Sequence, residues 1–193
     1  MKSLLRILVV IVTAGLAGCG GGGGEMVARI GSGGSGAPVS AGAGAVSGFG
    51  SIIVNGQHYD ETSAQVFVDE RPDLPSAASV DAIRLGSQIR FEHLSNRISQ
   101  ATVAAEVIGP VASVGANTLT VLSQTVRVNA AAASPTVFDG FTALTDLTAG
   151  SIVEVHGQRN AAGEIVASRI ELRPATGVMR VAGTIASAAS DSF

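Results

Sequence analysis

Residues 51–60 read SIIVNGQHYD, a β-branched run followed by the dipeptide Asn55-Gly56 and a short polar segment. β-Branched side chains favour strands because they fit a pleated, half-buried surface. Asn and Gly tolerate the positive φ angles that a two-residue hairpin turn requires at both of its central positions. The stretch therefore predicts a tight β-hairpin with strands at 51–54 and 57–60.

Other stretches with strand character continue from this hairpin toward the end of the chain. Apolar and polar residues alternate at 64–69 and 88–92, and this period of two is typical of half-buried strands. A loop with two prolines is expected at 71–80, and residues 103–107 are expected to close this first unit. A second unit is predicted with strands at 110–114, 118–122, 125–128, 152–156 and 165–172. The chain is therefore predicted to be all-β.

Internal similarity indicates that the two units are repeats. The segment 86–91 (GSQIRF) corresponds to 150–155 (GSIVEV), and Ile83 and Leu147 lie three positions before the respective glycines. Both apolar residues are expected to fill a core ahead of a tight turn. Segment 181–187 is similar to 107–113, so a third copy begins near the end of the sequence. Either this copy is truncated, or its strand pairs onto the second unit.

Each full unit contains about five expected strands in about 60–70 residues, the size of a small closed barrel such as the OB fold. We expect two tandem five-stranded, OB-like barrel modules at 48–107 and 108–176, and an incomplete third module at 177–193. A β-sandwich built from both repeats is the competing architecture.

The beginning of the chain has the pattern of an export signal. Lys2 and Arg6 precede an apolar run that ends near residue 16. This run is shorter than the ~20 apolar residues that a membrane-spanning helix needs. The tetrapeptide Leu16-Ala17-Gly18-Cys19 resembles the lipobox of bacterial lipoproteins. That resemblance implies removal of residues 1–18 and lipid attachment at Cys19, and Gly20 favours the outer membrane. The alternative is an ordinary signal peptide with a chance cysteine.

Residues 19–47 are rich in Gly, Ser and Ala and predict a flexible linker after the lipidated cysteine. Removal of residues 1–18 lowers the count of basic residues from 12 to 10 against 15 acidic ones, for a net charge of −5. An acidic chain with few aromatic residues and no Trp argues against nucleic-acid binding, which rests on phosphate neutralisation and base stacking.

Three stretches of the chain resemble a bacterial family catalogued as domain of unknown function 5666. They are residues 48–56 (GFGSIIVNG), 146–157 (DLTAGSIVEVHG) and 167–171 (ASRIE). The resemblance covers residues 48 to about 187 and implies an exported protein with tandem β modules. It implies no activity, cofactor or binding residue. The first module departs from the pattern at 91–94, where FEHL stands in place of the second module's VHG.

No set of residues has the spacing of a catalytic or metal site. His58, His93 and His156 are far apart in the sequence and are expected to be exposed or satisfied. The acidic residues of segments 60–61 and 69–73 lack the spacing of a calcium loop and are expected to be solvated. We therefore expect no catalytic residue, no metal site, no cofactor and no enzymatic activity.

The expected function is that of a lipid-anchored cell-envelope protein that serves as a structural or interaction module without catalysis. The alternative is a binding module for a small ligand, a glycan or a divalent cation on a barrel face. Its expected partners are the membrane, through the lipid on Cys19, and an envelope protein or glycan; nucleic acid is not expected.

Overall fold

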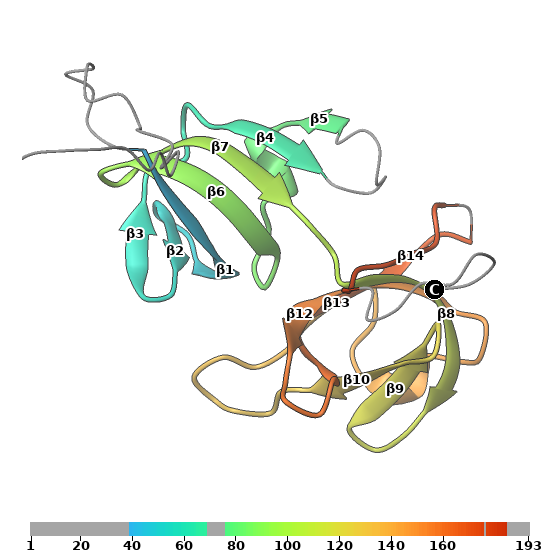
Figure 1. Ribbon diagram of the computed structural model, residues 1–193. Helices are drawn as coiled ribbons and strands as arrows, with labels where there is room; N and C mark the ends of the chain where they lie inside the picture. Colours follow the sequence, from blue (N-terminus) through green and yellow to red (C-terminus); the bar gives the residue numbers. More distant parts are fainter. Residues whose placement is uncertain (1–38, 69–75, 176, 185–193) are drawn as a thin grey trace, which may run out of the picture. The chain divides into compact units, whose positions relative to one another are not determined.

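A computed structural model describes residues 39–68, 76–175 and 177–184 of the chain (Figure 1). The expected signal peptide, Cys19 and most of the expected linker lie outside the described residues. Within them the secondary structure consists of β-strands and two 3-10 turns, η1 (Val80–Ala82) and η2 (Leu144–Asp146), so the predicted all-β class is confirmed. No helix in the described part of the chain is long and apolar enough to span a membrane.

The strands of the first sheet are β1 (Ser40–Gly48), β2 (Ile52–Val54), β3 (Gln57–Tyr59), β4 (Gln65–Val68), β5 (Ser76–Ala78), β6 (Gln88–Leu94) and β7 (Arg97–Val103). Their order is β3-β2-β1-β6-β7-β4-β5, with β4 and β7 parallel and the other neighbours antiparallel. A single parallel bridge joins Asp60, after β3, to Arg97 at the start of β7. This bridge brings together the two ends of the row β3-β2-β1-β6-β7.

The strands of the second sheet are β8 (Val107–Val114), β9 (Thr118–Val121), β10 (Gln124–Val128), β11 (Val137–Asp139), β12 (Ile152–Arg159), β13 (Ile165–Arg173) and β14 (Arg180–Val181). Along the sheet the order is β10-β9-β8-β12-β13-β11. A further parallel pairing between β10 and β13 closes β8, β9, β10, β13 and β12 into a five-stranded barrel (Figure 1). Closure removes the free strand edges, as in small OB-like barrels.

Each sheet encloses its own hydrophobic core. The first core contains Ile52, Ile89 and Ile98, and the second contains Leu119 and Ile165, all of them at most 1% exposed. Two separate cores are the arrangement expected of tandem barrels. The alternative of one β-sandwich core made from both repeats is therefore not adopted.

The turns predicted from the sequence occupy the expected places. Asn55 and Gly56 have φ angles of 52° and 76°, and Val54 pairs with Gln57 across the turn. Ile83 and Leu147 are 3% and 4% exposed and belong to the two cores. Both predictions, the tight hairpin and the two core-filling residues, are confirmed.

The chain begins its first strand earlier than the sequence analysis predicts. Residues 40–47 were expected to be linker but belong to β1, which pairs with β6 from Ser40 to Ala45. From Ser40 to Ala45 the strand has only small side chains, and partner side chains occupy the space beside it. An added Cβ on Gly42 would lie 2.4 Å from Cζ of Phe91, its partner on β6. The expected linker therefore ends before Ser40.

Two further segments differ from or refine the expectations. The region 71–80, expected to be a loop, contains β5 and the start of η1, while residues 69–75 lie outside the described part. At the other end of the chain, Arg180 and Val181 form β14 and pair with Ile108 and Val107 of β8. Of the two fates considered for the third copy, pairing of its strand onto the second module is the one observed.

Candidate functional site

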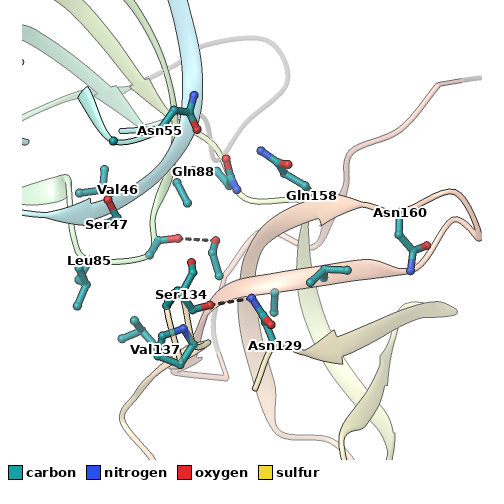
Figure 2. Close-up of a pocket in the computed structure, with 18 of the residues that line it drawn as sticks. Val46, Ser47, Asn55, Leu85, Gln88, Asn129, Ser134, Val137, Gln158 and Asn160 are labelled. Carbon is teal, nitrogen blue, oxygen red and sulfur yellow. Dashed lines mark hydrogen bonds between the residues drawn. The ribbon is translucent and has the colours of Figure 1, made fainter. Parts of the chain in front are cut away.

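A pocket of about 670 Å³ lies between side chains of the two modules (Figure 2). The first module contributes residues of β1, the hairpin turn at Asn55 and Gly56, and the turn from Leu85 to Gln88. The second module contributes the loop after β10, the end of β12 and the first half of β13. The volume falls within the range of about 300–1,000 Å³ that is usual for small-molecule sites.

The polar side chains that line this pocket are mostly uncharged. Its lining contains five carboxamide side chains, those of Asn55, Gln88, Asn129, Gln158 and Asn160. None of the described residues that line it is acidic, and Arg159 is the charged one. The Arg159 guanidinium is occupied, because it donates to the carbonyl oxygens of Gly163 and Ala182 at 3.0 and 2.9 Å.

Three of the five carboxamides are fixed by the protein itself. The Nδ2 atom of Asn55 donates to the carbonyl oxygen of Ala43 at 3.0 Å, and that of Asn129 donates to the carbonyl oxygen of Ser134 at 2.7 Å. The Oδ1 atom of Asn160 accepts hydrogen bonds from two backbone N–H groups of the following turn. These side chains shape the walls of the pocket.

The other two carboxamides are available to a ligand. Within the described residues, the side chains of Gln88 and Gln158 form no hydrogen bond with the protein, and both line the pocket in Figure 2. A neighbouring cavity of about 440 Å³ is lined by the same two glutamines. Gln88 and Gln158 therefore offer donors and acceptors to both spaces.

The histidines singled out in the sequence do not meet. The ring of His58 is 3.3 Å from Oγ of Ser51, and Nδ1 of His93 is 2.6 Å from the carbonyl oxygen of Ser95. His156 is buried in the second module. Among the described residues, no three His, Cys, Asp or Glu side chains gather in a way that could hold a metal ion.

His156 has a partner that the sequence analysis did not identify. Its Nε2 atom lies 2.9 Å from Oε1 of Glu154, and both side chains are at least nine-tenths buried. Burial acts to raise the pKa of Glu154, but the hydrogen bond from His156 and the positive charges of Arg173 and Arg169 leave it below its usual value. The two residues alternate with core positions on β12, and this spacing is the signal that could have revealed the pair.

The Nδ1 atom of His156 faces the chain that connects the modules. It accepts a hydrogen bond from the backbone N–H of Gln88 at 3.3 Å, and the carbonyl oxygen of Ala104 lies 3.2 Å away. Every contact of the imidazole is thus with the protein. We interpret the Glu154–His156 pair as a structural link between β12 and the first module.

A second buried charge lies on β13. Arg169 is 4% exposed, and it pairs with Asp139 and, at 3.2 Å, with Glu171.

In the predicted acidic cluster of the first module, the carboxylates of Asp60 and Glu61 form hydrogen bonds within the protein. Asp60 accepts hydrogen bonds from Thr62, and Glu61 accepts one from the N–H of Ile52. The acidic residues at 69–73 lie outside the described residues.

Comparison with known proteins identifies one family. Residues 108–171 match the model of a family described as "Domain of unknown function (DUF5666)". No curated protein and no solved structure matches the chain. The match runs from β8 into β13 and so covers the closed barrel of the second module. The parts of the expected resemblance at residues 48–107 and 172–187 lie outside the match and stay predictions.

Proposed function

We propose that the chain, of which residues 108–171 match the DUF5666 family model, is a lipid-anchored envelope protein that acts by binding rather than by catalysis. The observation that supports this proposal is the pocket lined by carboxamides. Its described lining offers no His, Cys, Asp or Glu side chain for general acid–base or nucleophilic chemistry.

The ligand class follows from the same lining. Divalent cations such as Ca²⁺ prefer several carboxylate oxygens, which this lining lacks. Carboxamides donate and accept at once, so Gln88 and Gln158 suit the hydroxyl and amide groups of a neutral sugar. Of the ligands considered from the sequence, a neutral glycan therefore fits this pocket best. Because no aromatic ring lines it, we expect modest affinity.

The pocket can be tested with the full chain carrying Cys19→Ser and a neutral probe, an oligomer of N-acetylglucosamine. We expect saturable binding by calorimetry and its loss in the Gln88→Ala/Gln158→Ala variant. Gln57→Ala is the matched control, because Gln57 is an exposed glutamine on β3 that lines no described pocket. If Gln88→Ala/Gln158→Ala binds the probe as tightly as Gln57→Ala does, or if the parent does not bind it, the pocket is not a sugar site.

The anchor is tested separately, by metabolic labelling with a clickable fatty acid. We expect the label on the wild-type chain and its loss in Cys19→Ser, together with release of the protein into the soluble fraction. An unlabelled wild-type chain would contradict the lipid anchor and would leave the pocket proposal standing.

A further inference from the structure

One turn of the first module contacts the second module through its backbone. The turn consists of residues 84–87, and it lies against β13. Ser168 Oγ donates to the carbonyl oxygen of Gly86 at 2.6 Å, and Arg169 Nη1 donates to that of Leu85 at 3.2 Å. Arg84 adds an ion pair of 3.2 Å with Glu171. We call residues 84–87 the first docking turn, and Ser168 with Arg169 its receptor.

The approach is so close that only glycine fits at the centre of the turn. Gly86 has a φ angle of +80°, which disfavours L side chains. A Cβ added to it would lie 2.5 Å from the carbonyl oxygen of Ser168 and 2.9 Å from Cβ of Arg169. The geometry of this turn is therefore matched to the strand that receives it.

The second module contains the same turn at residues 148–151, which we call the second docking turn. The N–H of Gly86 donates to Val46 and that of Gly150 to the equivalent Val111, each at 2.8 Å. The Ser87 and Ser151 hydroxyls accept hydrogen bonds from the N–H groups three positions earlier, at 3.3 and 3.1 Å. Gly150 has a φ angle of +92°, close to that of Gly86. The second turn thus has the backbone conformation of the first.

The two turns differ in what covers them. No described atom would lie within 4 Å of a Cβ added to Gly150, and residues 148–150 are exposed. The contacts of the first turn are made by backbone carbonyls, so Ala149 can present the same group as Leu85. Thr148 stands where Arg84 stands in the first turn, so the ion pair with a receptor glutamate would be missing.

We propose that the second docking turn binds a further module of the kind formed by residues 108–171, through that module's serine–arginine receptor. The first module cannot serve as this partner. Glu92 pairs with Gln100 in the first module as His156 pairs with Arg169 in the second, so the first module's residues at the receptor positions are Ser99 and Gln100, which lack the arginine. The receptor of the second module is already covered by the first docking turn of the same chain. The partner is therefore a second-type module with an open receptor.

The probe for this interaction is a second copy of the chain whose receptor has been uncovered. Gly86→Val places side-chain atoms against Ser168, and Arg84→Glu faces Asp139 and Glu171 with a like charge. Each variant should release the first docking turn by a different physical route. Chains with an open receptor and a free second turn are then expected to associate head to tail.

We expect sedimentation velocity of the Cys19→Ser chain to show monomers for the parent and concentration-dependent oligomers for both release variants. Adding Thr148→Arg to Arg84→Glu restores the missing cation and should tighten association about threefold to fivefold, as one exposed ion pair does. Adding Gly150→Val or Arg169→Ala to a release variant should return it to monomers.

Circular dichroism should first establish that each variant is folded, before the oligomeric states are compared. Arg84→Glu keeps the test decisive if Gly86→Val does not fold, because the Arg84 side chain is 51% exposed and its replacement leaves the turn intact. Monomers in Arg84→Glu/Thr148→Arg, or oligomers that persist when Arg169 is also replaced, would overturn the proposal.

Discussion

Glu154 and His156 lie two positions apart on β12, and their side chains meet in the interior with Nε2 and Oε1 2.9 Å apart. Residues i and i+2 of a strand share a face, so a short spacing places both polar groups on the buried side. Oε2 of Glu154 accepts no hydrogen bond within the described residues, although Arg173 Nη1 lies 3.4 Å away. The pair is compensated by charge as well as by hydrogen bonding.

Replacement of Glu154 should therefore be costly. Glu154→Ala leaves His156 and Arg173 without their shared carboxylate, and we expect a loss of about 3 kcal/mol in the free energy of unfolding. Urea denaturation measures this change. Glu106→Ala is the control, since Glu106 forms a longer, partly exposed pair with Arg159 at 3.6 Å and should cost less than about 1 kcal/mol. Similar losses for both variants would contradict a structural role for the buried pair.

The fold should lose stability in acid because the Glu164 carboxylate on the second module becomes protonated. Hydrogen bonds from Arg127 and Asn160 lower the pKa of Glu164 from 4.5 to about 2. A carboxyl with a lowered pKa stabilises the fold above its unfolded pKa, and the contribution is lost as the pH falls through the folded value. Thermal melts of wild type and Glu164→Gln should thus differ most near neutral pH. The difference should shrink between pH 4.5 and 2; a gap that widens in acid would count against this pair.

Local signals predicted the parts of the fold that local chemistry controls. The Asn55-Gly56 turn needs two positive φ angles, and Ile83 and Leu147 are large apolar residues at fixed places before a glycine turn. Each follows from a few neighbouring residues. The closed barrel of the second module was predicted from the length and strand count of one repeat.

The parts that escaped prediction depend on partners distant in the sequence. β1 is rich in glycine and alanine and shows no strand pattern of its own, because β6 supplies the bulky side chain of the Gly42–Phe91 pair. The candidate pocket combines residues from both modules, such as Gln88 and Gln158. No periodicity within either segment indicates that two such side chains line one space.

The wall of the pocket formed by the loop after β10 should depend on Asn129. Its side chain donates to the carbonyl oxygen of Ser134 at 2.7 Å and accepts from the N–H of Ala131 at 3.1 Å. Asn129→Ala should cost about 1–2 kcal/mol and speed hydrogen exchange at Ala131, because both bonds are lost. Asn117→Ala is the control, since the exposed Asn117 side chain forms no hydrogen bond within the described residues. Unchanged exchange in Asn129→Ala would show that the loop is held by other contacts.

The first strand offers the sharpest distinction between the linker expected from composition and the strand observed. In a flexible linker Gly42→Ala would change stability little, because both residues are tolerated there. In β1 the new Cβ would lie 2.4 Å from Cζ of Phe91, whose ring is 4% exposed and in contact with Tyr59. Overpacking of this kind costs about 1–3 kcal/mol, so we expect a lower midpoint of urea denaturation. Gly183→Ala is the matched control, since no described atom lies within 4 Å of its added Cβ. If the two variants unfold at the same urea concentration, Gly42 does not lie against Phe91 and β1 does not pair with β6 as described.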